Sequence, residues 1–434
     1  MGRVFVMGII VYMMILVVGL YGGVTGKISG RVVDAQTGEG IAGANVVIIG
    51  TTMGAATDID GNYFIINVPP GTYDLRATVI GYDTLVIRNV QVFSDKTTNL
   101  DFKLTPTVIK AKEVQVVAKR PPVEKDVTAT STYVTGEEIR SMPVQTVGEV
   151  LVTKTGVVAR GGDIHMRGGR ATEVSYLIDG MPVNDPIYGY QAIGVATQAV
   201  QEVNAIVGAF NAEYGNAMSG VVNIVTKEGN PTRYSGSMLF RTNDFGFPSF
   251  NEFVYSYNKD RVEFNISGPE PVTTNLLPVL GIELPRANRM SFFFAYNQEN
   301  DDGEMLNRVW DFENHLFKRE LLQTPYLLKK TGWYGIFPKR QSNYINTTLK
   351  LKQRLSSAIT YSLSYISTMS EYNNFDWDYY YTPATTSLIK SLSRQFSLSL
   401  THTLSSRTFY EVKLSNLYTR REVLPAGGKS PGDF

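Results

Sequence analysis

The side chains that most often carry catalysis are scarce in this sequence. It contains no cysteine and three histidines, His165, His315 and His402, which stand far apart. The absence of cysteine excludes disulfides, thiolate zinc sites and a cysteine nucleophile. Three scattered histidines leave little material for a metal cluster or a Ser-His-Asp triad. We therefore expect no catalytic residue, no metal site and no cofactor.

Two segments resemble ion-binding motifs but lack residues that those motifs require. Residues 58–62 read Asp-Ile-Asp-Gly-Asn, but an EF-hand loop needs an acid or Asn at Ala56 and a Glu at Asn67, so a hairpin turn is favoured. The glycine runs after Arg160 and Arg167 lack the Gly-Lys-Ser/Thr ending of a phosphate loop. The chain has 41 Lys+Arg and 40 Asp+Glu, and this balance argues against nucleic acid as a partner.

A short apolar strand offers a different chemistry, the pairing of backbone groups. It ends shortly before the proline pair at 121–122, which stops a sheet from extending. One interpretation makes it the last strand of the preceding domain. The other, which we favour, is an exposed strand whose N–H and C=O groups bind an edge partner. Its residues are Glu113, Val114, Gln115, Val116 and Val117.

The distribution of residue types along the chain predicts the elements that position these segments. Residues 1–232 hold 15 of the Phe, Tyr and Trp residues and residues 233–434 hold 34, so two kinds of structure meet near residue 232. At the start, Arg3, an apolar run over 4–20 and small residues near 23–26 predict a signal peptide over 1–26. The alternative is a retained membrane anchor, because the run is just long enough to span a bilayer.

Residues 27–105 show short β-branched runs separated by turn residues. The runs at 28–33, 44–49, 63–68, 73–79, 84–87 and 99–104 predict an antiparallel sandwich of about seven strands. The segments 28–34 (Ile-Ser-Gly-Arg-Val-Val-Asp), 69–73 (Pro-Pro-Gly-Thr-Tyr) and 79–82 (Val-Ile-Gly-Tyr) resemble the carboxypeptidase regulatory-like domain. That resemblance implies a prealbumin-like β-sandwich and no reaction. Residues 106–124 form the linker that contains the short strand.

Residues 125–230 predict a mixed α+β domain. Thr135 and Glu138 form a capping-box pattern for a helix that stops before Pro143, and a second amphipathic helix ends at Gly156. Short strands are expected at 157–160, 164–167, 174–178 and 221–226, and Asp179-Gly180 is a hairpin signal.

Residues 231–434 predict the first strands of a transmembrane antiparallel β-barrel. Apolar and polar residues alternate over stretches of about ten residues, which is the length of a tilted membrane-spanning strand, whereas strands in soluble sandwiches average about five or six. Strands are expected near 233–243, 260–268, 289–298, 343–354, 357–370, 391–404 and 407–420. From residue 299 onward the connections are alternately long and short, as in outer-membrane barrels, and only the 269–288 connection is longer than expected.

The long connections hold aromatic residues suited to binding a ligand. About seven strands cannot close a barrel, because an open edge leaves backbone groups unpaired in hydrocarbon. We therefore expect the chain to be a fragment of a longer barrel protein. The aromatic residues in the long connections are Trp310, Trp333, Trp377, Tyr379, Tyr380 and Tyr381.

Three motifs in the middle of the chain resemble the plug domain of TonB-dependent outer-membrane receptors. They are His-Met-Arg-Gly-Gly at 165–169, Tyr-Leu-Ile-Asp-Gly-Met-Pro-Val at 176–183 and the Tyr-Gly-Asn to Thr-Lys run at 214–227. By this resemblance Glu113–Val117 corresponds to the TonB box, and Arg167 matches an arginine that latches plug to barrel. The alternative for Arg167 is an ordinary surface or turn arginine. The matching plug residues are Arg167, Gly168, Gly169, Asp179 and Gly180.

The resemblance implies a mainly β receptor that imports a scarce nutrient and is not an enzyme. Its expected partners are a TonB-type energising protein, outer-membrane lipid, and a small-molecule, oligosaccharide or peptide ligand. Its expected place is the outer membrane, with sandwich and plug facing the periplasm. The main alternative is an outer-membrane binding or adhesion protein without active transport, which would tolerate deletion of Glu113–Val117. An exported hydrolase would need a catalytic constellation that these residues do not supply.

Overall fold

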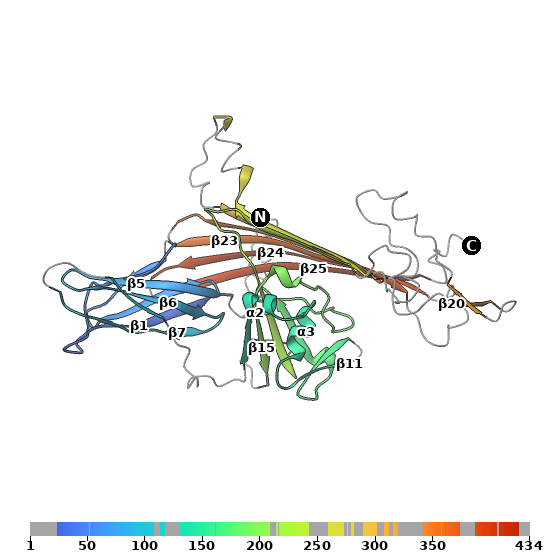
Figure 1. Ribbon diagram of the computed structural model, residues 1–434, viewed down its shortest axis with the longest axis horizontal. Coiled ribbons are helices and arrows are strands. Elements are labelled where there is room, and N and C mark those ends of the chain that lie inside the picture. Colours follow the sequence, from blue (N-terminus) through green and yellow to red (C-terminus); the bar gives the residue numbers. More distant parts are fainter. Residues whose placement is uncertain are drawn as a thin grey trace, which may run out of the picture.

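The computed structural model contains three folded parts (Figure 1). A β-sandwich comes first, a small middle domain follows, and a large antiparallel sheet ends the chain. The region of the predicted signal peptide, up to residue 23, lies outside the described residues. The structure describes residues 24–51, 53–107, 113–117, 131–160, 162–208, 214–215, 217–242, 259–272, 276, 279–281, 290–301, 308–311, 316–319, 342–356, 358–373, 387–405 and 408–424.

The sandwich consists of two sheets around a core that includes Ile28, Leu75 and Phe102. One sheet contains β4 (Asn62–Val68), β1 (Gly26–Asp34), β7 (Thr97–Asn99) and β8 (Phe102–Leu104). The other contains β3 (Gly54–Ala56), β2 (Asn45–Ile48), β5 (Gly71–Thr78) and β6 (Thr84–Val92), with β9 (Glu113–Val117) at its edge.

Two expectations for the sandwich need correction. The sheets are mixed rather than purely antiparallel, because β7 and β8 pair parallel to β1 after the chain crosses from the other sheet. The strand β9 is not unpaired, since its five residues pair parallel with β6 from Thr84↔Glu113 to Arg88↔Val117. It is the last strand of the sheet, which is the interpretation that the sequence favoured less.

The middle domain has a five-stranded sheet with two short helices packed against it. The helix α2 (Gly136–Ser141) has the expected capping box at Thr135, and α3 (Val147–Val152) follows as expected. The predicted strands appear as β11 (Val157–Arg160), β12 (Asp163–Met166), β13 (Val174–Ile178) and β16 (Gly220–Thr226). The sequence analysis missed β10 (Ser131–Thr135), β14 (Met181–Pro182) and β15 (Val200–Val207), which lies between β10 and β16.

The large sheet has seven strands, as predicted, and every neighbouring pair is antiparallel. The tight turns after β22 and β24 both lie at one end of the sheet, while the long connections after β19 and β23 lie at the other. The strands are β17 (Ser235–Thr242), β18 (Asp260–Pro269), β19 (Met290–Asp301), β22 (Ser342–Arg354), β23 (Ile359–Asn373), β24 (Leu388–Thr403) and β25 (Phe409–Leu424).

The two faces of this sheet differ in chemistry because successive side chains of a strand point to opposite sides. One face carries exposed apolar rows, such as Leu363 beside Leu398 and Leu414. The other face packs on the middle domain, whose buried core continues into Phe293 and Ile366 of the sheet. Figure 1 shows the middle domain lying against this face. Among the described residues, no helix is long and apolar enough to cross a membrane.

Candidate functional site

A buried lysine joins the middle domain to the large sheet. The side chain of Lys350, on β22, is 5% exposed. Its Nζ lies 3.0 Å from Asp179 Oδ2 and donates to Thr226 Oγ1 over 3.1 Å. Both partners belong to the middle domain, one in the turn between β13 and β14 and the other at the end of β16. A charge buried in this way needs such partners, because desolvation would otherwise be very unfavourable.

The local sequence explains why Asp179 stands ready for this contact. Asp179 and Gly180 both have positive φ angles, 50° and 74°, which is the backbone of the Asp-Gly hairpin turn that the sequence predicted. The carboxylate of Asp179 also accepts hydrogen bonds from the backbone N–H and the hydroxyl of Thr226, over 2.9 and 2.6 Å. The turn therefore presents a fixed carboxylate to the sheet.

Glu228, just beyond β16, extends this cluster. Its carboxylate lies 3.7 Å from Nζ of Lys350 and 2.6 Å from Nζ of Lys352. Burial alone would raise the pKa of Glu228, but the two lysines outweigh it and hold this pKa below its ordinary value. Glu228 thus stays ionised near neutral pH. We call Lys350, Lys352, Asp179 and Glu228 the latch, because these charges attach the middle domain to the sheet.

A second junction is formed by backbone groups of Gly194. Its carbonyl oxygen accepts a hydrogen bond from Asn346 Nδ2 at 2.5 Å, and its N–H donates to Thr368 Oγ1 at 3.1 Å. A Cβ atom at this glycine would lie 2.2 Å from the hydroxyl oxygen of Tyr344, and its next neighbour would be 3.4 Å away. The loop therefore seats under Tyr344 only because residue 194 has no side chain.

Replacing Gly194 by alanine is expected to weaken the seating of the middle domain by about 1–3 kcal/mol, since overpacking a close contact has this magnitude. Tyr344→Phe removes the clashing oxygen and should restore most of the loss. Native-state hydrogen exchange of the β13 and β16 amides, in detergent, measures both effects. Gly215→Ala is the matched control, because nothing lies within 4 Å of its Cβ position. Equal destabilisation by the single and double variants would contradict this account.

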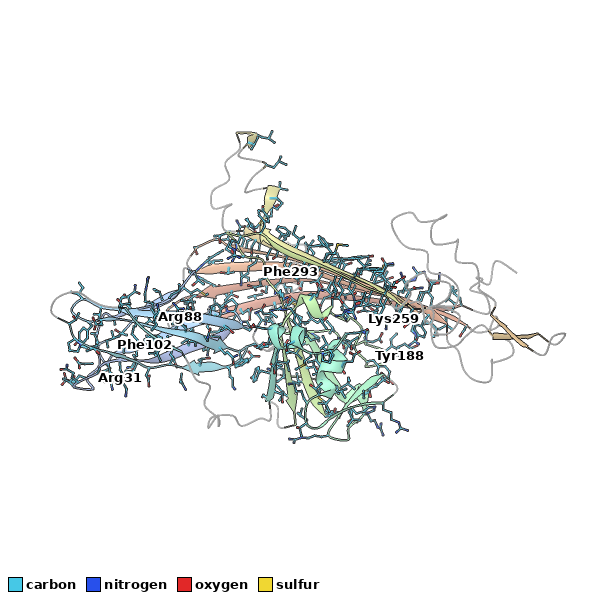
Figure 2. All side chains as sticks on the ribbon, in the orientation of Figure 1. Arg31, Arg88, Phe102, Tyr188, Lys259 and Phe293 are labelled. Carbon is cyan, nitrogen blue, oxygen red and sulfur yellow. The ribbon has the colours of Figure 1, made fainter. Side chains whose placement is uncertain are left out.

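The end of the middle domain nearest the long connections presents aromatic side chains. Tyr188 and Tyr190 are 49% and 42% exposed, and the guanidinium of Arg421 lies 5.1 Å from the ring centre of Tyr188. Figure 2 shows Tyr188 toward that end of the molecule. On the same side, Arg261 of β18 donates to the carbonyl oxygen of Gln145 over 2.8 Å.

The structure separates the residues of the predicted plug motif into two places. Asp179 belongs to the latch and Gly180 completes its turn, whereas the segment from Arg167 to Gly169 forms a turn within the middle domain. Arg167 has a φ of 47° and its Nη1 lies 2.5 Å from the Cβ position of Gly208. A Cβ at Gly169 would lie 2.3 Å from Ser219 Cβ, so this turn needs glycine. The latching role of Arg167 stays a prediction.

The predicted ligand residues lie mostly beyond what the structure describes. Trp310 is on β20 (Arg308–Asp311), which pairs with β21 (Leu316–Arg319) in a hairpin within the connection after β19. Trp333, Trp377, Tyr379, Tyr380 and Tyr381 lie outside the described residues. The sequence analysis also missed the latch lysines. Their only local signal was the presence of two positive charges, Lys350 and Lys352, on the polar side of a strand in which apolar and polar residues alternate.

Two known families match parts of this chain. The pattern of the family "Carboxypeptidase regulatory-like domain" matches residues 27–105. The pattern of "TonB-dependent Receptor Plug Domain" matches residues 123–221, which cover most of the middle domain. The chain is similar to the TonB-dependent receptors in this region. The middle domain is accordingly called the plug from here on.

Two proteins that are similar to this chain are described as a TonB-dependent transporter and a TonB-dependent receptor. The chain is 27% identical to the "TonB-dependent transporter Oar" of Myxococcus xanthus, in a match that covers 49% of the present chain. It is 31% identical to the "TonB-dependent receptor P39" of Formosa agariphila, in a match that covers 48% of the present chain. The matches span 21% and 20% of those two proteins. The siderophore receptor PirA of Pseudomonas aeruginosa aligns in structure with a TM-score of 0.45 at 18% identity, covering 70% of this chain and 42% of that one.

Proposed function

We propose that this chain acts in nutrient uptake across an outer membrane, driven by a TonB-type energising protein. The observation that carries the proposal is the latch, which holds a plug on the polar face of a seven-stranded antiparallel sheet. A plug that fills a pore must be held firmly at rest and released on demand. Ion pairs and hydrogen bonds suit this task, because they depend on geometry and break once the plug shifts.

The dimensions of the large sheet support a membrane location. The strands β23, β24 and β25 have 15, 16 and 16 residues, more than the roughly 9–11 that a tilted strand needs to cross a bilayer. The face away from the plug carries the apolar rows that lipid would contact. By this proposal, the tight turns and the sandwich face the periplasm. The long connections and the exposed side chains of Tyr188 and Tyr190 then face outward.

The strand β9 is the proposed handle for the energising protein. It lies at the edge of the five-stranded sheet, and its residues Gln115 and Val116 are exposed. An extended segment of a partner can add to such an edge by backbone hydrogen bonds. The proposed division of the chain keeps 27–105 as the sandwich, 106–124 as the linker with the handle, 125–230 as the plug and 231–434 as barrel strands.

Binding to the energising protein tests the proposal. The periplasmic part of the cell's own TonB-type protein is purified and its binding to the chain in detergent is measured. Successive N–H groups of a strand point to opposite edges, so either Gln115→Pro or Val116→Pro must remove an N–H from the outer edge. We expect at least one of these variants to bind at least tenfold more weakly, since a lost backbone hydrogen bond of about 1 kcal/mol and the local distortion act together.

Val116→Thr is the matched control, because threonine keeps the N–H and favours strands. It should bind like the parent chain. Undiminished binding by both proline variants would overturn the handle and, with it, the energised uptake.

A further inference from the structure

The sandwich contacts the plug through a short loop between β6 and β7, residues 93–96. The backbone N–H and the hydroxyl of Ser94 both donate to Oε1 of Glu202, over 3.1 and 2.5 Å. Ser94 and Glu202 are each 0% exposed. Glu202 lies on β15, the strand between β10 and β16 in the plug sheet. A loop of one domain is therefore anchored on a buried carboxyl group of the other.

Three further contacts surround this anchor. The rings of Phe93 and Tyr133 are 5.0 Å apart, and Nζ of Lys96 lies 4.9 Å from the centre of the Tyr133 ring. Tyr214 donates its hydroxyl proton to Oδ2 of Asp95 over 3.2 Å. Tyr133 is on β10, so the loop contacts both β10 and β15. We call residues 93–96 with these partners the clamp.

The end of β4 and the loop that follows it contact both the plug and the large sheet. The carbonyl oxygen of Pro70 accepts a hydrogen bond from Gln201 Nε2 over 2.9 Å. Asn67 Nδ2 donates to Thr403 Oγ1, at the tight-turn end of β24, over 3.0 Å. Figure 1 shows the sandwich beside this end of the sheet. The sandwich thus bridges the plug and the sheet on one side of the molecule.

The clamp holds the part of the plug that a pull on β9 reaches first. Along the chain, β10 is the next strand after β9. β10 is also an edge strand, which pairs with β15 from Ser131↔Ile206 to Thr135↔Glu202. An edge strand can separate from its sheet without breaking the remaining pairs. Peeling β10 from β15 is therefore the natural first step of plug release, and it must also break the contacts of Phe93 and Lys96 with Tyr133, which the Ser94–Glu202 anchor holds in place.

We propose that the sandwich is a lock on the plug: while docked through the clamp it holds β10 on β15, and plug release requires the sandwich to undock. This inference rests on the proposed function for its purpose, and on the clamp contacts for its existence. It assigns a task to the domain that the resemblance describes only by its fold.

Mechanical unfolding tests the lock directly. Because the chain has no cysteine, Gln115→Cys provides a unique attachment point for a pulling tether on the chain held in detergent micelles. The pull first separates β9 from β6, and we expect the next rupture, at the clamp, to occur at lower force in the double variant Ser94→Ala/Lys96→Ala than in the parent. Tyr214→Phe, which removes a single oxygen atom, should lower the force by a smaller amount. An unchanged rupture force in both variants would overturn the lock.

Hydrogen exchange supplies an independent readout that also reveals misfolding. In the double variant, the β10 amides should exchange at least tenfold faster, as expected for the loss of one hydrogen bond to a charged group. Amides around Phe102 in the sandwich core should be unchanged. Arg31→Ala, near the far end of the sandwich in Figure 2, should leave both readouts unchanged. Neither measurement needs the energising protein, so failure of the uptake proposal would not be mistaken for failure of the lock.

Discussion

Lys350→Met is expected to lower the free energy that holds the plug on the sheet by about 3–5 kcal/mol, the usual cost of removing one partner from a buried ion pair. Methionine fills similar space but leaves Asp179 and Thr226 without the ammonium group that they contact at 3.0 and 3.1 Å. Glu228 retains its ion pair with Lys352, so the loss of stability should be largest at the Asp179 turn. Native-state hydrogen exchange of the Thr226 amide, in detergent, measures the loss.

One control variant and one double variant test whether the loss comes from the Lys350–Asp179 pair. Lys390→Met removes a lysine of β24 that is 44% exposed and whose carboxylate partner, Glu371, lies on the neighbouring strand of the same sheet, so it should not change exchange in the plug. Adding Asp179→Asn to Lys350→Met removes both charges of the pair. The double variant should therefore lose less than the sum of the two single effects. Normal plug exchange in Lys350→Met would show that the latch contributes nothing.

Glu202→Gln is expected to strengthen the docking of sandwich on plug at pH 8 by about 3 kcal/mol, the equivalent of the shift in its pKa. Burial raises the pKa of the Glu202 carboxyl to about 7, although the hydrogen bonds from Ser94 act in the opposite direction. Nearby Asp95 raises this pKa further and Lys96 lowers it. The second oxygen, Oε2, has no hydrogen-bond partner among the described residues. A neutral glutamine keeps an acceptor for Ser94 without this buried charge.

The sign of the pH dependence follows from the raised pKa. Between about pH 4.5 and 7 the docked state binds more protons than the open state, so docking weakens as the pH rises through this range. Below that range the penalty is absent. The opening free energy of the β15 amides, measured by hydrogen exchange at pH 5 and pH 8 and corrected for intrinsic rates, should fall in the parent and stay level in Glu202→Gln. Glu137→Gln, at an exposed site on α2, should behave like the parent. Parallel profiles for the parent and Glu202→Gln would contradict the assignment.

The sequence predicted best where structure depends on neighbours along the chain. The capping box at Thr135, the Asp179-Gly180 turn and the seven alternating strands depend on short spacings, and all appear in the structure. The strand β15 was missed because almost all its side chains are buried. A strand covered on both faces lacks the alternation that reveals a half-exposed one.

The amino-acid sequence by itself determined the order of the three parts, the long two-faced strands and the turn that carries Asp179. Only the tertiary structure decided which charges meet. Lys350 and Asp179 are 171 residues apart, and Ser94 and Glu202 are 108 apart. Periodicity and capping report on local backbone geometry. The partner of a buried charge is chosen by desolvation, which acts only after distant segments have packed together. The pairing of β9 with β6 was likewise decided by the folded chain, because the backbone N–H and C=O groups of β9 meet those of β6 only once the sandwich has formed.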